Sequence, residues 1–507
     1  MLQSVWSRLR RRRSIPPALA RDMFDADLDR ARHKTGCALC RLVREHDQQV
    51  MHSFLWEYCT DPHIGARISK SWGFCPYHTW SLGVLEHERI GDGLGIGIVY
   101  QAVLRQLDRL LPSLQPIRRR NISTALPIGP EIGTTSCRFC QLARQEEFQF
   151  LTRLTKRFQQ SISSGDERDW SSLQTVLCIP HMKRLLQACS EGVAFRQSSW
   201  RLMGLFQGKR DSLTDDPQQR EMQALATHLI QCTAQRVNEQ NHTLQAMSIG
   251  WSQIAEHLEI LVGDLQALPI HASTKTQQPI PRHLLLVTGQ RSHLQSPDSE
   301  TCPVCAAEAS ACIAKCLSTL SEREPLPSTA AFCQSHHWIL AASIAAQRQD
   351  YADRYYSWLQ QQLENQYMKL TNARTYKDMQ DEQNCVVCSY ASEIGNEAIG
   401  DIVQGLRQTY DGSTNPEGKM LCLFHWRKVQ QSCAREADAF PLQERLLQRQ
   451  RQHLLHLDMA VEAYLARFSA SKRERGEVPD VPGAAWAWER LLAFFAGEPT
   501  LEYALGG

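Results

Sequence analysis

The apolar positions of this chain recur at helical spacing along most of its length. After Cys388, for example, the apolar residues fall four apart: Tyr390, Ile394, Ala398, Ile402 and Leu406. After Cys40 they are Leu42, Val43, Val50, Met51, Phe54, Leu55 and Tyr58. Each series forms one apolar stripe on a helix. The alternation typical of strands is scarce, and its best example, residues 284–288, is short. The pattern predicts an all-α protein.

Two stretches carry the spacing of a helix–helix seam. In residues 244–268, apolar side chains alternate three and four positions apart: Leu244, Met247, Trp251, Ile254, Leu258, Leu261, Leu265 and Leu268. Such a series is an a/d seam, but the flanking positions lack the paired charges of a dimeric zipper. A similar series runs from Leu454 to Phe468. We expect these helices to pack inside the chain, and a homodimer through 244–268 or 442–468 is the alternative.

Four copies of one cysteine- and histidine-containing motif run along the chain. Each copy is Cys-x-x-Cys, a gap, and Cys-x-x-His. The copies are Cys37, Cys40, Cys75 and His78; Cys137, Cys140, Cys178 and His181; Cys302, Cys305, Cys333 and His336; and Cys385, Cys388, Cys422 and His425. Three thiolates and one imidazole are the ligand set of a closed, tetrahedral structural zinc site. We expect each copy to bind one zinc through its own four residues, which gives four zinc ions per chain.

The spacing inside each copy predicts a helical hairpin. The Cys pair opens one helix, a shorter helix returns, and the Cys-x-x-His pair opens a third. Asp61 and Pro62 are typical of a helix start, as N-cap and first helical residue. The intervals between the second and third Cys are 35, 38, 28 and 34 positions. A helix of about 16 residues is about 24 Å long, so each gap is long enough for two antiparallel helices.

The copies divide the chain into two tandem, related halves. Proline-containing, polar stretches mark the linkers. The expected parts are a basic tail (1–30), an N-terminal half (31–268), a linker (269–300), a C-terminal half (301–470), and a second linker with an aromatic tail helix (471–507). The tail holds Trp486, Trp488, Leu491, Leu492, Phe494 and Phe495. We expect it to dock on the body of the protein, with partner binding as the alternative.

Charge and hydropathy exclude several classes of protein. The 507 residues include 56 Lys and Arg against 54 Asp and Glu. This balance argues against a dedicated nucleic-acid binder and against general attraction to anionic membranes. No run of about 18 apolar residues is present, so no transmembrane helix is expected. No apolar segment follows Arg10–Arg13, which argues against a secretory signal. We therefore expect a cytoplasmic protein, where thiols stay reduced.

Other interpretations of the cysteines and histidines remain open. The sites could hold iron–sulfur clusters, or their thiolates could oxidise and release zinc. Six of the 18 cysteines lie outside the motifs: Cys59, Cys189, Cys232, Cys312, Cys316 and Cys433. We expect them to be buried as small apolar residues. Cys312 and Cys316, one helical turn apart, could instead form a thiol pair or supply alternative ligands. His337 could compete with His336, and the spacing of the other motifs favours His336.

No arrangement of residues indicates catalysis. Gly91, Gly93, Gly95 and Gly97 resemble a phosphate-binding loop in composition, but no preceding strand supports that interpretation. The sequence shows no Ser/His/Asp arrangement, no supported pair of catalytic carboxylates and no P-loop. Catalytic and cofactor-binding residues other than the metal ligands are therefore not predicted.

The first two motifs resemble an uncharacterised prokaryotic family of helical proteins with paired Cys-x-x-Cys and Cys-x-x-His motifs. The resemblance is carried by Cys37-Ala-Leu-Cys40, Gly73-Phe-Cys75-Pro-Tyr-His78, Cys137-Arg-Phe-Cys140 and Leu177-Cys178-Ile-Pro-His181. It covers about residues 30–200. Residues 300–430 keep the ligands without the flanking residues and look like a diverged second copy. The resemblance implies zinc binding and a helical fold, and it implies no activity.

Three functions follow as hypotheses. The first is a non-catalytic, zinc-stabilised scaffold that binds a protein or other macromolecule through its helical surface. The second is a thiol or zinc sensor whose sites release metal on oxidation. The third is an enzyme with an unrecognised pocket between the halves. The partner, the oligomeric state and the redox lability of individual sites are not specified by the sequence.

Overall fold

The computed structural model describes the greater part of the chain. The described residues are 26–28, 30–31, 36–90, 93–110, 137–164, 176–188, 229–231, 233, 251–262, 302–321, 332–347, 351–372, 385–408, 420–481 and 484–496. The linker predicted at residues 269–300, together with the short alternating stretch 284–288, lies outside these residues. So do most of the basic tail and about half of the 244–268 seam.

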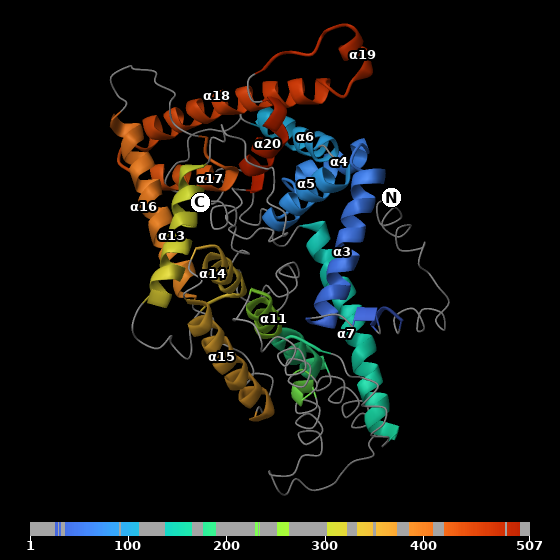
Figure 1. The fold of residues 1–507 in the computed structure, drawn as a ribbon. Coiled ribbons are helices and arrows are strands. Elements are labelled where there is room, and N and C mark those ends of the chain that lie inside the picture. The colour runs from blue at the N-terminus through green and yellow to red at the C-terminus, as the bar shows by residue number, and fades with distance from the viewer. Residues whose placement is uncertain are drawn as a thin grey trace, which may run out of the picture. The chain divides into compact units, whose positions relative to one another are not determined.

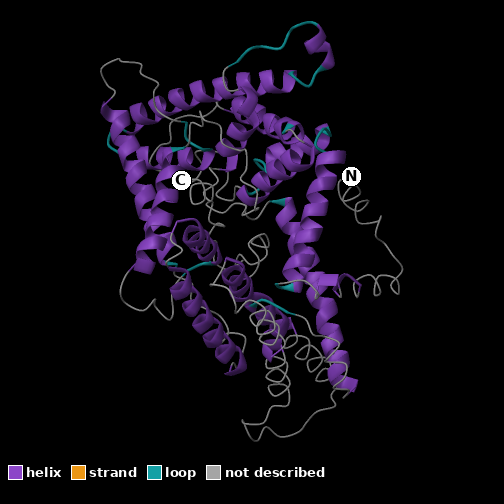
Figure 2. Cartoon of the chain, viewed as in Figure 1, coloured by secondary structure: helices purple, strands orange, loops and turns teal. Residues whose placement is uncertain are grey.

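Every regular element in the described residues is helical, which confirms the all-α prediction (Figures 1 and 2). In chain order the helices are α3 (Ala38–Glu57), α4 (Pro62–Lys70), α5 (Pro76–Ile90), α6 (Leu94–Leu110), α7 (Arg138–Ser164), α11 (Trp251–Val262), α13 (Pro303–Ser321), α14 (Gln334–Gln347), α15 (Ala352–Asn372), α16 (Val386–Gln408), α17 (Leu423–Cys433), α18 (Ala439–Ala466), α19 (Ala470–Glu474), the 3-10 helix η7 (Ala484–Trp486) and α20 (Ala487–Ala496). A further helix covers residues 179–188.

The chain forms two compact units, and each combines separate segments. Unit 1 comprises residues 1–46, 146–267 and 356–381, and unit 2 comprises residues 47–145, 268–355 and 382–507. Three helices, α3, α7 and α15, therefore continue from one unit into the other. The tandem division at residues 268 and 301 stays a prediction, because the linker lies outside the described residues.

Unit 1 is built around the start of α3, most of α7, and α11 and α15. The backbone N–H of Ala38 donates to the carbonyl of Val176 at 3.0 Å, which ties the start of α3 to the segment before the 179–188 helix. On α11, Ile254 and Leu258 are buried, as the seam pattern predicts. His257 Nε2 lies 3.3 Å from the hydroxyl of Tyr356 on α15, so the buried polar groups of the two helices are paired.

In unit 2, the turn into the first Cys-x-x-His pair is fixed by local chemistry. Asp61 caps α4, because its Oδ1 accepts from the backbone N–H of His63 at 2.8 Å. This confirms the predicted helix start. After α4, Gly73 has a φ of +91°, a conformation that side chains rarely adopt. A Cβ at Gly73 would also lie 2.7 Å from the ring of Tyr100, whose hydroxyl accepts from the Phe74 N–H.

The glycine-containing segment before α6 is a helix start capped from within the chain. The carboxylate of Glu86 accepts from the backbone N–H groups of Gly95 at 2.5 Å and of Ile96 at 2.8 Å. In a phosphate-binding loop, these backbone N–H groups would donate hydrogen bonds to the phosphate. The observed cap therefore supports the sequence-based interpretation of a packed helix entry. Gly91 lies outside the described residues.

The C-terminal helices close the core of unit 2. Helix α18 packs against α6, α16, α17 and α20, and α20 also packs against α5 and α6. Leu491, Leu492 and Phe494 of α20 are fully buried, so the aromatic tail is docked, as predicted. The α18 seam is used in the same core, since Leu457 and Val461 are also fully buried. None of the helices in the described part of the chain is long and apolar enough to span a bilayer.

Removing buried volume from α20 tests its place in the core. We expect Leu491→Ala to lower the free energy of unfolding by about 2–5 kcal/mol, because the deletion leaves a cavity where the side chain is 0% exposed. Guanidinium unfolding followed by far-ultraviolet circular dichroism measures the loss. The matched control is Leu455→Ala on α18, where the side chain is 59% exposed and the expected change is below about 0.5 kcal/mol. Equal effects would contradict the docked position of α20.

Candidate metal centres

The sixteen motif residues converge in four groups within the described part of the chain, but not in the grouping that their order predicts. The groups are Cys37, Cys40, Cys178 and His181 (site 1); Cys75, His78, Cys137 and Cys140 (site 2); Cys302, Cys305, Cys422 and His425 (site 3); and Cys333, His336, Cys385 and Cys388 (site 4). The prediction that the four residues of each copy form one metal site is therefore wrong. Each Cys pair meets the Cys-x-x-His pair of the neighbouring copy. Sites 1 and 2 draw on copies one and two, and sites 3 and 4 on copies three and four.

Helix length explains the exchange in the first copy. Helix α3 has 20 residues, so it carries the chain about 30 Å away from Cys37. The return helix α4 has only 9 residues, or about 13 Å. The chain therefore comes back only partway along α3. His78 lies beside Asp47, in the middle of that helix, rather than beside Cys40 at its start.

Each pair sits at the start of a helix, with its first cysteine at the cap. In all eight pairs, the carbonyl of the first cysteine accepts the first helical hydrogen bond, as from Arg41 to Cys37 at 3.1 Å and from Trp426 to Cys422 at 2.8 Å. Residues three positions apart lie on the same helix face, so both side chains point to one centre. The helix dipole at this end favours thiolates. Every site thus joins the positive ends of two helices.

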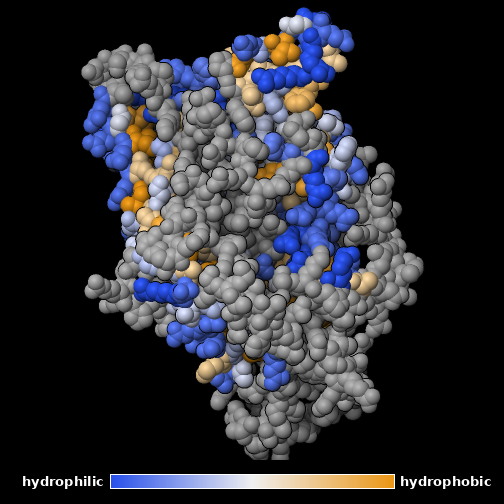
Figure 3. Space-filling model, viewed as in Figure 1, coloured by the Kyte–Doolittle hydropathy of each residue, from blue (hydrophilic) through white to orange (hydrophobic). Residues whose placement is uncertain are grey.

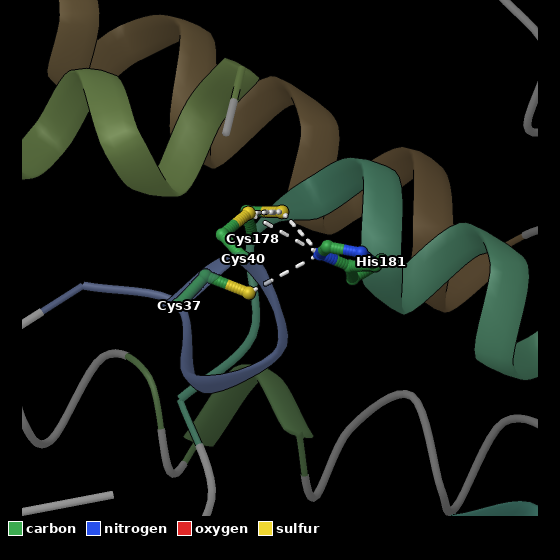
Figure 4. A group of neighbouring side chains, drawn as sticks. All are labelled: Cys37, Cys40, Cys178 and His181. Atoms are coloured by element: carbon green, nitrogen blue, oxygen red, sulfur yellow. Dashed lines mark hydrogen bonds between the residues drawn. The ribbon is translucent and has the colours of Figure 1, made fainter. Parts of the chain in front are cut away.

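The distances within the groups fit a single tetrahedral ion. In site 1, Cys40 Sγ lies 3.7 Å from Cys178 Sγ, and His181 Nδ1 lies 3.2–3.4 Å from the three sulfurs (Figure 4). In the other groups, neighbouring sulfurs such as Cys75 and Cys140 lie 3.5–3.8 Å apart. Tetrahedral zinc with bonds of about 2.3 Å to sulfur and 2.0–2.1 Å to nitrogen has ligand separations of about 3.5–3.8 Å. The groups are therefore compatible with four zinc ions, the number predicted.

The same distances argue against iron–sulfur clusters. A cluster places several iron and sulfide atoms between its protein ligands, which must then lie well apart. All ligand atoms of each group lie within 4.8 Å of one another, which leaves room for one ion. All four protein positions of that ion are filled in every group.

Three of the four histidines face a buried carboxylate, which the sequence analysis did not identify. His78 Nε2 lies 3.1 Å from Asp47 Oδ2, His181 Nε2 lies 3.2 Å from Glu147 Oε1, and His425 Nε2 lies 3.2 Å from Glu308 Oε2. A carboxylate in this place orients the imidazole and makes its other nitrogen a stronger ligand. Nδ1 is the nitrogen that faces the sulfurs in each group.

Two of these carboxylates follow a spacing rule that the sequence does contain. Asp47 and Glu147 lie seven positions after Cys40 and Cys140, two helical turns along α3 and α7. The equivalent positions in the other copies are Cys312 and Gly395. Comparison of the four copies position by position would have revealed the rule.

At Gly395, the missing side chain makes room for the carboxylate of site 3. A Cβ at this position would lie 2.4 Å from Glu308 Oε1. Glu308 comes from α13, the neighbouring helix that packs along α16. It therefore takes the place that Asp47 and Glu147 hold in the first two copies. At Cys312, a thiol replaces the carboxylate and lies 3.3 Å from His336 Nε2.

The charges in site 2 suit a divalent cation. Burial by itself would lower the pKa of His78, but the Asp47 carboxylate and the Cys75 and Cys137 thiols raise that pKa well above its usual value. Burial would raise the pKa of Cys137, but hydrogen bonds with Cys140 and Cys75 and the charge of His78 lower it well below the usual value. The site thus stabilises thiolates beside a positive charge, and a bound ion would replace the imidazole proton as that charge.

The remaining sequence predictions concern His337 and the six other cysteines. His337 is not in a group; its Nδ1 lies 3.4 Å from the Tyr355 hydroxyl, and burial lowers its pKa to about 4. Cys316 and Cys433 are fully buried, as expected for apolar packing, and burial raises the pKa of Cys433 to about 11. Cys59 is only partly buried. Cys189 and Cys232 lie outside the described residues.

Zinc stoichiometry distinguishes the observed grouping from the sequential one. The double variant Cys40→Ser/Cys178→Ser removes two ligands of one site, so we expect three zinc ions per chain by elemental analysis. The matched variant Cys40→Ser/Cys75→Ser removes one ligand from each of two sites, so we expect two. If each copy bound its own zinc, the first variant would hold two zinc ions and the second three. That result would refute the grouping described above.

Loss of a supporting carboxylate should weaken one site selectively. We expect Glu147→Gln to lower the zinc affinity of site 1 about 10–100-fold, because the amide is a weaker partner for His181. Competition with a chromogenic chelator measures the change. The control is Glu146→Gln, the preceding position on α7, whose carboxylate lies 3.9 Å from His46 rather than at a group. Identical affinities in the two variants would show that Glu147 does not support the site.

Comparison with known proteins gives one match. Residues 26–213 match the model of a family of unknown function, DUF6062. No curated protein and no solved structure matches the chain. The match covers less than half of the 507 residues, and it includes every ligand of sites 1 and 2. It confirms the resemblance of the first two motifs to an uncharacterised family, and over these residues the chain is similar to DUF6062.

Proposed function

We propose that this chain is a non-catalytic helical scaffold, held together by one zinc ion in each of sites 1–4, that binds a protein partner. The observation that carries the proposal is the closure of the four groups. Each offers four protein ligand atoms within 4.8 Å of one another. A catalytic zinc keeps a coordination position open for water or substrate, and a site with four protein ligands does not.

The position of the groups supports a structural role. Every site joins the starts of two helices that are distant in sequence, such as α3 and the 179–188 helix in site 1. The Cys and His ligands are at most partly exposed, and most are buried. Metal binding therefore contributes to folding, at about 10–16 kcal/mol for a structural zinc in small domains. Such thiolate-rich sites are suited to the reducing cytoplasm.

The hollows found on the described surface lie away from the metal groups. Two hollows hold about 220 and about 570 Å³, and none of the sixteen ligands lines either of them. In the view of Figure 3, the described surface mixes hydrophilic residues with small apolar areas. This combination favours binding through a helical surface over chemistry in a pocket.

One apolar area on α18 is suited to a partner. Leu455 and Met459 are 59% and 50% exposed and lie four positions apart, so they share one face of the helix. The opposite face is buried in unit 2 through Leu457 and Val461. A homodimer through 442–468 would therefore use the exposed face rather than the seam. Because the net charge is only +2, contact with the partner would rest on shape and apolar area more than on long-range attraction.

Chelation and a surface variant together test the proposal. Removing zinc under reducing conditions should abolish most of the helical circular dichroism signal, and added zinc should restore it. Binding of a co-purified protein partner should be lost with the signal. The variant Leu455→Glu/Met459→Glu should keep four zinc ions and full helicity, and should bind the purified partner at least about tenfold more weakly.

The control for the surface variant is Met368→Glu, an exposed apolar position on α15 that lies outside every metal motif. It should leave binding unchanged. Sedimentation of the purified chain alone reports whether the partner is a second copy. A zinc-depleted chain that keeps its helices would contradict the structural role of the metals. A zinc-loaded chain that binds no macromolecule at micromolar concentration would contradict the scaffold.

A further inference from the structure

Site 4 differs from the other three groups in its exposure. All four ligands of sites 1, 2 and 3 are buried. In site 4, the residues Cys333 and Cys388 are only partly buried, whereas Cys385 and His336 are buried. Oxidation of cysteine depends on thiolate character and on access. Site 4 is therefore the least deeply buried of the four groups, and a solute approaches it most easily.

Site 4 also differs in what supports its histidine. The Nε2 atoms of the other three ligand histidines lie 3.1–3.2 Å from a carboxylate oxygen. His336 Nε2 lies 3.3 Å from the thiol of Cys312 instead. A thiol is a weak hydrogen-bond partner, so it does little to strengthen the imidazole as a ligand. Exposure and histidine support are independent features, and both weaken the hold of site 4 on its ion.

We propose that site 4 is the oxidation-sensitive site of the chain, at which a hydroperoxide converts Cys333 and Cys388 to a disulfide and zinc is released while sites 1–3 stay loaded. This inference rests on the zinc-loaded scaffold proposed above. It gives the sensor hypothesis of the sequence analysis a specific pair of residues.

The chemistry balances with the hydroperoxide as the only oxidant. One thiolate attacks the O–O bond, which breaks; the sulfur becomes a sulfenic acid and the other oxygen leaves as alkoxide. The second thiolate attacks the sulfenic sulfur, forms the S–S bond and expels hydroxide. The two sulfurs together lose two electrons, which the O–O bond receives. Two protons from water convert the alkoxide and hydroxide to alcohol and water.

The geometry favours Cys333 and Cys388 as the pair. Their sulfurs lie 3.8 Å apart, and they are the two residues of the group that are only partly buried. A disulfide needs a sulfur separation of about 2.05 Å, so a small approach suffices once the ion has left. Zinc would then keep only Cys385 and His336 as ligands, too few for a stable site. The helix starts of α13 and α17 are joined by site 3, so they stay joined.

Stepwise titration of the zinc-loaded full chain with hydrogen peroxide tests this inference. Released zinc is measured with a chromogenic chelator, and differential alkylation with mass spectrometry locates the oxidised cysteines. We expect the first zinc to leave at least about tenfold faster than the second, with Cys333 and Cys388 modified and the other ligand cysteines intact. Release of all four ions at one rate would overturn the inference, as would first modification of cysteines in another site.

A variant isolates the effect of histidine support. Cys312→Asp gives His336 the carboxylate that Asp47 gives His78, so we expect the first release to slow by about tenfold or more. Ala314→Asp, which adds the same charge at an exposed position of α13, should leave the rate unchanged. If Cys312→Asp fails to fold, the titration of the unaltered chain decides alone. Purified protein that contains no zinc would refute the scaffold proposal itself, which separates that failure from a failure of the present inference.

Discussion

The structure depends on one constraint: a tetrahedral ion must take two ligands from each of two helix starts. A cysteine at the cap and a cysteine or histidine three positions later point to one side of a helix, so a single start supplies only half of a site. The other half must come from a second start. The lengths of the intervening helices decide which second helix start can lie next to the first. Ligand geometry and helix length together therefore determine the architecture, and the hydrophobic core packs around the result.

Ligand identity and helix starts could be predicted from the sequence because they are local. The motif spacing specifies two side chains on one helix turn, and Asp61 with Pro62 specifies a cap. The grouping of the ligands into sites could not be predicted, because it depends on the lengths of the intervening helices. Hydrophobic periodicity does not specify where those helices end. For the first copy, the sequence predicts a shorter return helix, but not that α4 has only 9 residues against the 20 of α3. Since α4 is too short for a full return, Cys75 meets Cys137 and Cys140 rather than Cys37 and Cys40.

The supporting residues show a second limit of sequence reasoning. Asp47 and Glu147 look like ordinary charged positions on amphipathic helices, and only their common distance from a Cys pair sets them apart. Glu308 does not follow that spacing at all. It acts because Gly395, on a neighbouring helix, leaves the space that its carboxylate needs. A substitution on one helix is thus compensated from another, and this kind of relation becomes visible only when the helices are placed side by side.

The exchange of ligands between neighbouring copies defines the smallest part of the chain that can fold with complete sites. One copy alone supplies a Cys pair and a Cys-x-x-His pair that do not meet, so it leaves two half-sites with two ligands each. Two neighbouring copies complete two sites. The family match over residues 26–213 contains both sites of the first pair in full, and residues 302–425 contain both sites of the second. Because each half-site offers only two ligands, a single copy closes no metal site and lacks the folding free energy that zinc binding supplies. The pair of copies, rather than the single motif, is therefore the part of the chain in which the metal sites are complete.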